Sequence, residues 1–255
     1  MRIRVYENAV ALSRAAAADA ARLLRETIAA RGGARLIAAT GTSQIAFLEA
    51  LCAEPSIAWD RVELFHLDEY LDLPPNHPAS FVRFLRERLI DRAGIRRMHM
   101  LDTAADDGRA DEVIRRVSAE LAKAPIDLAF TGIGENAHLA FNDPPADLET
   151  TTPFLVVELD EACRRQQVGE GWFRDVAEVP RRAITMSVHQ ILQAREILCL
   201  ASGVRKRQAV ADSFGDADVR AAVPASALRT HGRTTIYLDR AAAAGLAPEQ
   251  LARWV

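Results

Sequence analysis

Apolar and polar residues alternate along the chain in blocks whose lengths fit helices and strands in turn. Residues 8–31 are rich in alanine and leucine at helical spacing, and two glycines directly after them mark the end of that helix. Further on, short apolar runs of strand length are separated by stretches with helical spacing. The predicted strands cover residues 34–40, 61–67, 97–101, 126–132, 155–159, 182–188, 195–201 and 234–239, and further helices are predicted over 45–54, 80–91 and 108–123. This alternation predicts an α/β, Rossmann-like three-layer fold with a mostly parallel sheet flanked by helices.

Length, composition and charge narrow the class of protein. The chain has 255 residues, of which 49% are hydrophobic and 26% are charged, as in soluble globular proteins. It contains no internal repeat or low-complexity linker, so we expect a single domain over residues 1–255. The formal net charge is −3 and the basic residues form no long stripe, so neither nucleic acid nor a membrane surface is expected as a partner.

The sequence also bears on the compartment. No apolar run approaches the ~20 residues that span a bilayer, and the first ten residues lack the apolar core of a signal peptide. Cys52, Cys163 and Cys199 are widely spaced without a CxxC pair, so neither a disulfide framework nor a zinc site is indicated. We therefore expect a cytoplasmic protein with a small-molecule partner. No residue pattern distinguishes a monomer from a homo-oligomer.

Unusual polar chemistry follows four of the predicted strands, in residues 40–44, 68–78, 132–145 and 201–208. In a parallel α/β sheet, ligands bind at the carboxyl ends of the strands, so these loops are the candidate site. The first, TGTS at 40–43, opens a helix whose early N–H groups and hydroxyls suit an anion. The alternative is that Thr42 or Ser43 is an ordinary helix cap.

The second loop, HLDEYLDLPPNHP at 66–78, holds three carboxylates and two histidines. Its spacing matches no compact metal motif, so we expect no bound metal. A carboxylate at the end of a strand, placed to move protons on a bound substrate, is the sharper interpretation. The other interpretation is that Asp68 and Glu69 only begin a solvent-exposed loop after the strand.

The third loop reads GIGENAHLAFNDPP and covers residues 132–145. A dinucleotide-binding loop needs a helix directly after its glycines, and the two prolines exclude a long one here. Imidazole titrates near neutral pH, so His138 is a candidate general acid–base group that Asn136 and Asp143 could orient. A structural role for His138 is the alternative. The fourth loop leads into a helix that carries Arg205, Lys206 and Arg207, which are either a solvated basic face or phosphate ligands.

Five short motifs run through roughly residues 35–240. They are TGTS at 40–43, LDEYLDL at 67–73, HPASF at 77–81, GIGENAHLAFNDP at 132–144 and GVRK at 203–206. In this order they resemble the glucosamine-6-phosphate deaminase/isomerase family, which is related to the 6-phosphogluconolactonases. Tyr70 and the LAFN run at 139–142 resemble the deaminase branch, since the lactonase branch usually has Asp-Glu-Arg and a GxGxDGHTAS loop.

The resemblance implies an amino-sugar 6-phosphate as substrate and requires no cofactor, because a carboxylate and an imidazole suffice for enolisation. Asp68 would move a proton between the second and first sugar carbons, and His138 would shuttle a proton at the ring oxygen. Loss of ammonia would then give fructose 6-phosphate. The resemblance implies that substrate and phosphate bind to Thr40, Gly41, Thr42, Ser43, Glu69 and Lys206. In the segment 163–173, which does not match the family's arginine-bearing phosphate segment, we expect Arg165, or else Arg164, to supply a further cation.

Several positions depart from the family pattern. Asn136 stands where the family usually has an aspartate, and its amide oxygen can accept the ring N–H of His138 but supplies no charge. Asp143 replaces a glutamate and is one methylene shorter, Gln44 replaces a proline, and Ala137 replaces a glycine. These changes bear on the substrate more than on the reaction class. Two alternatives therefore stay open, a 6-phosphogluconolactonase-type hydrolase and a non-catalytic sugar-phosphate sensor.

Overall fold

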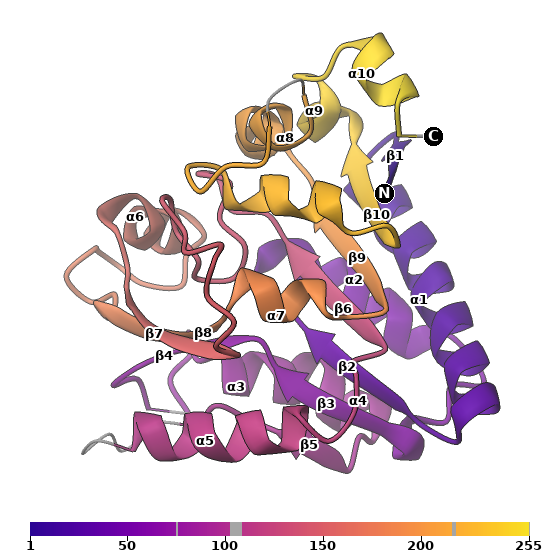
Figure 1. Cartoon of the computed structure of the whole chain (residues 1–255), viewed down its shortest axis with the longest axis vertical. Helices are drawn as coiled ribbons and strands as arrows, with labels where there is room; N and C mark the ends of the chain where they lie inside the picture. The colour runs from indigo at the N-terminus through magenta and orange to yellow at the C-terminus, as the bar shows by residue number, and fades with distance from the viewer. Residues whose placement is uncertain (75, 103–108, 216–217, 255) are drawn as a thin grey trace.

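The centre of the protein is a seven-stranded parallel sheet with the order β1-β10-β9-β6-β2-β3-β5 (Figure 1). Its strands are β1 (Arg2–Tyr6), β2 (Ala34–Ala38), β3 (Val62–His66), β5 (Arg97–His99), β6 (Leu128–Gly132), β9 (Glu196–Ala201) and β10 (Thr234–Asp239). The computed structural model describes residues 1–74, 76–102, 109–215 and 218–254; residue 75 of the second loop and residue 108 of a predicted helix lie outside them. The predicted parallel α/β sheet is confirmed. Strand β1, which the sequence pattern did not predict, pairs with β10 at one edge.

Helices cover both faces of this sheet, as the three-layer prediction requires. Strand β2 shows the principle, because Leu36 and Ala38 pack in one apolar core and Ile37 packs in the other. Alternate residues of a strand point to opposite faces, so a strand buried on both sides is apolar throughout. The first core takes residues of α1 (Ala9–Arg31), α2 (Thr42–Ala53), α3 (Phe81–Leu85) and the π-helical turn η2 (Arg86–Ile90), which α4 (Asp91–Ala93) continues. The second takes residues of α5 (Ala110–Leu121), α7 (Val188–Leu192), α8 (Arg207–Phe214), η4 (Pro224–Thr230) and α9 (Arg240–Ala243).

A second, three-stranded antiparallel sheet corrects part of the prediction. Its order is β4 (Asp68–Tyr70), β8 (Arg182–Met186) and β7 (Phe154–Glu158). Residues 155–159 and 182–188 were expected in the parallel sheet, and Asp68 to Tyr70 were expected in a loop. An apolar run of strand length does not show which strand it pairs with, so the pattern missed this separation. Only Leu67 separates β3 from β4, so the chain passes directly from one sheet to the other.

The small sheet, together with α6 (Glu161–Gly169), lies beside the large one, on the left in Figure 1. An aromatic cluster packs beside the small sheet. The Tyr70 ring lies 4.9 Å from that of Phe81, 5.1 Å from that of Phe141 and 5.5 Å from that of Phe173, measured between centroids. The buried aromatic rings hold β4 and the loop after β6 together, and both of these carry residues of the candidate site.

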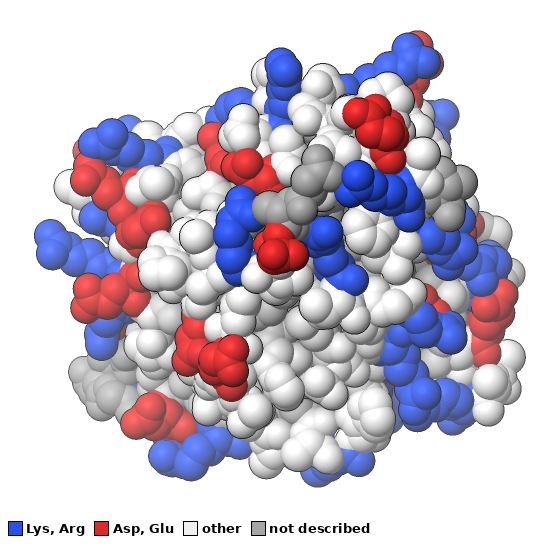
Figure 2. All heavy atoms as spheres, turned by 45° about the horizontal axis from the view of Figure 1, so that its top comes forward, with Lys and Arg blue, Asp and Glu red and all other residues white. Residues whose placement is uncertain are grey.

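The surface carries both signs of charge. On the face shown in Figure 2, basic and acidic side chains are interspersed and no single-sign patch extends across the view. The chain ends lie close together at one edge of the large sheet, where the Ile3 N–H donates to the Trp254 carbonyl at 2.8 Å. Among the described residues, no helix is long and apolar enough to cross a membrane.

Candidate active site

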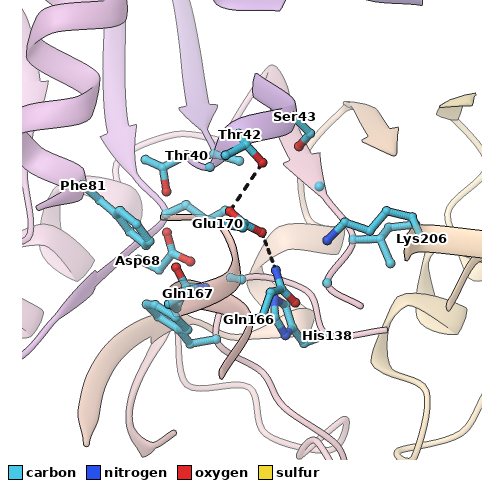
Figure 3. A pocket seen from close by; sticks show the side chains of 18 residues that line it. Thr40, Thr42, Ser43, Asp68, Phe81, His138, Gln166, Gln167, Glu170 and Lys206 are labelled. Atoms are coloured by element: carbon cyan, nitrogen blue, oxygen red, sulfur yellow. Dashed lines mark hydrogen bonds between the residues drawn. The ribbon is translucent and has the colours of Figure 1, made fainter. Parts of the chain in front are cut away.

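The four loops singled out in the sequence meet at one cavity, because the strands that precede them are neighbours. Strands β9, β6, β2 and β3 are adjacent and parallel, so their carboxyl ends share one edge of the sheet. The chain moves from β2 outward to β3 and β5 and then returns to β6, which makes this edge a topological switch point. The cavity encloses about 590 Å³, including space open to solvent, which is large enough for a hexose phosphate. Its walls include residues 40–43, Leu67, Asp68, residues 132–134, His138 and Lys206 (Figure 3).

One end of the cavity is formed by the N-terminus of α2. Gly41 precedes the helix with φ 101°, a conformation that favours glycine, and no side chain of the described residues caps the helix. Thr42 is the first helical residue, so neither Thr42 nor Ser43 is an ordinary cap. The uncapped N–H groups and the partial positive charge of a helix N-terminus suit an anion. Residues 40–43 all line the cavity, as the resemblance implied.

Lys206 supplies a cation to the same end. It ends the turn η3 (Val204–Lys206), which follows β9, and its side chain reaches the cavity (Figure 3). Burial lowers the pKa of Lys206, and the carboxylates of Glu170 and Glu135 oppose that shift. Arg205, by contrast, is exposed and its Nε lies 3.3 Å from Glu135 Oε1. A desolvated ammonium beside a helix N-terminus is a favourable site for a phosphate group.

Asp68 lies at the other end of the cavity, across from Lys206 (Figure 3). Its side chain comes from β4, whose pairing with β8 sets Asp68 opposite Thr185. The residue is 5% exposed, and its Oδ1 has no hydrogen-bond partner among the described residues. Burial, and then the charge of Glu69, raise the pKa of Asp68 well above the ordinary value. A carboxyl group with a raised pKa at a cavity wall is suited to proton transfer near neutral pH.

Glu69 does not line the cavity, although it is the next residue in the chain. Neighbouring residues of a strand point to opposite sides, so Glu69 faces away from Asp68. Its Oε2 accepts hydrogen bonds from Ser80 Oγ at 2.9 Å and from the Val82 N–H at 2.8 Å, and its Oε1 accepts from the Tyr70 N–H. Burial, only partly opposed by these hydrogen bonds, raises its pKa to about 7. Glu69 therefore fixes β4 to α3 through these hydrogen bonds. It does not line the cavity, where a substrate contact was expected for it.

His138 lines the cavity from the loop after β6. Its ring packs directly on Gly134, where a Cβ atom would lie 2.3 Å from the ring Cε1. Gly134 is therefore needed to make room for the imidazole. The ring Nδ1 lies 3.1 Å from Asp143 Oδ1, close enough for an ion pair but without the alignment of a hydrogen bond. Burial alone would raise the pKa of Asp143, but its interactions with His138 and Asn136 outweigh burial and lower it.

Asn136 does not contact the imidazole in the way that was expected. Its Oδ1 accepts the backbone N–H of His138 at 3.2 Å, and its Nδ2 donates to Asp143 Oδ1 at 3.2 Å. The ring therefore keeps a charged partner, Asp143, and Asn136 holds that partner in place. Asp143 reaches His138 although its side chain is one methylene shorter than a glutamate. The sequence alone could not show which of the two polar neighbours faces the ring.

Comparison with known proteins places the chain in a family. A family model described as glucosamine-6-phosphate isomerases/6-phosphogluconolactonase matches residues 7–237. The chain belongs to this family. It is 34% identical to a glucosamine-6-phosphate deaminase of an Exiguobacterium species over 234 residues, which cover 91% of this chain and 88% of that protein.

Solved structures of the family share the fold. A monomeric glucosamine-6-phosphate deaminase superposes with a TM-score of 0.87 at 27% identity, covering 96% of this chain and all 100% of the other. The 6-phosphogluconolactonase of Trypanosoma brucei has a TM-score of 0.79 at 20% identity, covering 96% and 98%, and shows likeness of fold alone. The resemblance read from the motifs is therefore confirmed at the level of the family.

Helix α6 adds cavity residues that the motifs did not reveal. Gln166, Gln167 and Glu170 all line the cavity, whereas Arg165 is exposed and pairs with Glu161 one helical turn away. Arg164 donates to the backbone carbonyls of Val176 and Val179, so it braces the chain after α6. Neither arginine reaches the cavity to supply the expected second cation. The segment 163–173 also holds a pair of glutamines and a glutamate between two glycines, but the resemblance pointed to an arginine there.

Two groups of side chains could in principle hold a metal ion among the described residues. They are His138 with Asp143 and Cys163, and Glu63 with His99 and Glu120, and the ligand atoms of each group lie within 4.8 Å of one another. In the first group, burial raises the pKa of the Cys163 thiol, which disfavours the thiolate that a metal requires. In the second, Glu63 already pairs with Arg35 at 2.9 Å and with His99 at 2.8 Å. Neither group lies on the loop at 66–78.

Proposed function

We propose that the protein is a sugar-phosphate isomerase and deaminase that converts glucosamine 6-phosphate and water into fructose 6-phosphate and ammonia. Its membership of the family and the names of its relatives support the substrate. The arrangement of the cavity supports the reaction, because it separates an anion site at Lys206 from a buried carboxyl group at Asp68. This separation is the observation that carries the proposal.

Binding begins at the phosphate. The N–H groups at the start of α2, with the hydroxyls of Thr42 and Ser43 and the ammonium of Lys206, take the phosphate group of the substrate. The sugar then extends from the phosphate across the cavity. Its first and second carbons, which are farthest from the phosphate, reach Asp68 on the opposite wall.

Ring opening uses His138. The imidazole takes the proton of the hydroxyl on the first carbon and returns a proton to the ring oxygen, so the bond between that oxygen and the first carbon breaks. Asp143 stabilises the imidazolium that forms in between, at 3.1 Å from Nδ1. Gly134 and Asn136 hold this pair in place.

The open chain is then isomerised by Asp68. Its carboxylate takes the proton from the second carbon, while the substrate's ammonium group gives a proton to the oxygen on the first carbon. Asp68 then delivers its proton to the first carbon, which leaves a hydroxyl on the first carbon and an iminium on the second. Water adds to the iminium carbon and ammonia leaves, so the carbonyl oxygen of the product comes from that water. Burial suits this role, because the raised pKa of Asp68 makes its carboxylate a stronger base than an ordinary aspartate.

Ammonia release tests the proposal. Purified protein with millimolar glucosamine 6-phosphate should release ammonia and fructose 6-phosphate in equal amounts, and Asp68→Asn should not. A protein that binds sugar phosphates but releases no ammonia would contradict the proposal and indicate a sensor. Hydrolysis of 6-phosphogluconolactone above its spontaneous rate, without deamination, would instead indicate the lactonase reaction.

A further inference from the structure

Two consecutive glutamines of α6 line the cavity but differ in their contacts. Gln166 is engaged at both ends of its amide, since its Oε1 accepts the Glu135 N–H at 2.9 Å and its Nε2 donates to Glu170 Oε1 at 2.8 Å. Gln167 is 5% exposed and also lines the cavity. Within the described part of the chain, its side-chain amide has no hydrogen-bond partner. Gln166 therefore positions other groups, while the amide of Gln167 is left for a ligand.

The amide atoms of Gln167 are not fully buried but open to the cavity, where a bound group can replace water as their hydrogen-bond partner. The amide offers both donors and an acceptor. A phosphate oxygen can use only the donors, whereas a sugar hydroxyl can use either. Figure 3 shows Gln167 on the side of the cavity that holds Asp68, across from Lys206. Gln167 therefore faces the sugar rather than its phosphate.

We propose that Gln167 is a specificity-determining residue that hydrogen-bonds a hydroxyl on the first three carbons of the sugar chain. The cavity then selects phosphate esters with a hydroxylated carbon chain long enough to reach from Lys206 to Gln167. Inorganic phosphate fills only the Lys206 end of the cavity, so Gln167 adds nothing to its affinity. The inference rests on the proposed function for the identity of the sugar, but the selection can be measured without turnover.

Binding of fructose 6-phosphate and of inorganic phosphate, measured by calorimetry, tests the inference. Gln167→Leu keeps most of the side-chain volume and removes the hydrogen bonds. The substitution should weaken the affinity for fructose 6-phosphate by about tenfold. The affinity for inorganic phosphate should stay within about twofold of that of the unchanged protein. The matched control is Gln166→Leu on the same helix, which releases Glu170 and should change the affinity for both ligands together.

An unchanged affinity of Gln167→Leu for fructose 6-phosphate, or an equal loss for both ligands, would overturn the inference. Circular dichroism and the melting temperature show whether the variant is folded, and Gln167→Glu, which keeps the acceptors, should recover part of the lost affinity. If the unchanged protein releases no ammonia, the proposed deamination fails, but the ratio of the two dissociation constants still tests Gln167.

Discussion

The two ends of the cavity bind by different physical means. At the Lys206 end, the start of α2 and a lysine offer positive charge that is already in place before any ligand arrives. At the Asp68 end, the polar groups are buried, and burial raises the pKa of the carboxyl group. A site for a permanent anion needs fixed donors, whereas a site that moves protons needs groups that change charge easily. The comparison suggests that binding and proton transfer can be disturbed separately.

Removing the carboxylate at the reacting end should have the largest effect. Asp68→Asn keeps the size of the side chain but cannot accept a proton from the second carbon. We expect kcat to fall by about 10²–10⁴-fold, the usual contribution of a general base. Steady-state ammonia release measures it, and activity equal to that of the unchanged protein would remove Asp68 from the mechanism.

A smaller loss is expected when the imidazole is displaced. A Cβ atom at Gly134 would lie 2.3 Å from the His138 ring, so Gly134→Ala must move the ring, and a shift of about 1 Å can cost about 10²-fold in kcat. Gly132→Ala is the matched control. Its Cβ would meet its nearest neighbours at 3.5 Å, an ordinary contact, so kcat should change little. An equal change of kcat in the two variants would show that the packing of His138 on Gly134 does not contribute to catalysis.

At the phosphate end, Lys206→Ala should raise KM by about 10- to 100-fold, because a hydrogen bond from a charged donor to the phosphate is lost. The kcat at saturating substrate should change much less. Initial rates over a wide substrate range separate the two constants. An unchanged KM would place the phosphate elsewhere in the cavity.

Substitution of Glu170 should strengthen phosphate binding, whereas substitution of Lys206 should weaken it. The Glu170 carboxylate accepts a hydrogen bond from Thr42 Oγ1 at 3.4 Å and faces Lys206, so it competes with an incoming phosphate for both. Glu170→Gln removes that charge and should strengthen the binding of inorganic phosphate by about fivefold, the effect of a partly screened charge. Calorimetry at low ionic strength measures it. Weaker binding would mean that Glu170 supports the phosphate site.

The smallest effect concerns the pH dependence of the unchanged protein. Asp68 must be ionised to act as a base, so kcat should fall as the pH drops through its raised pKa, well above the ~3.9 of an ordinary aspartate. The lowered pKa of Lys206 means that its charge is lost on the alkaline side before the ~10.4 of an ordinary lysine, so KM should rise there. Profiles of kcat and KM against pH test both directions. An acid limb near pH 4 would contradict the burial of the base.

Much of this site could be predicted from the sequence, because the residues concerned directly follow the strands whose ends form it. Residues 40–43, Asp68, His138 and Lys206 were all expected at one edge of the sheet, and all line the cavity. The family resemblance also suggested Glu69, but the resemblance does not show which way a side chain faces. The alternation of β4 turns it away from the cavity.

The pairing partners of side chains were harder to predict. Asn136 and Asp143 are both near His138 in the sequence, and only the folded loop shows that Asp143 faces the ring. The cavity residues of α6 were missed for another reason. A cation was expected from this segment, and the sequence does not show that Gln166 and Gln167 line the cavity while Arg164 and Arg165 face elsewhere.

The central claim is that phosphate binding and proton transfer reside at opposite ends of one cavity. The most direct test is the dissociation constant of Asp68→Asn for fructose 6-phosphate, measured by calorimetry beside that of Lys206→Ala. The account predicts that Asp68→Asn, although inactive, binds within about threefold of the unchanged protein, since only the transition state needs the base. A loss of binding in Asp68→Asn as large as that in Lys206→Ala would contradict it.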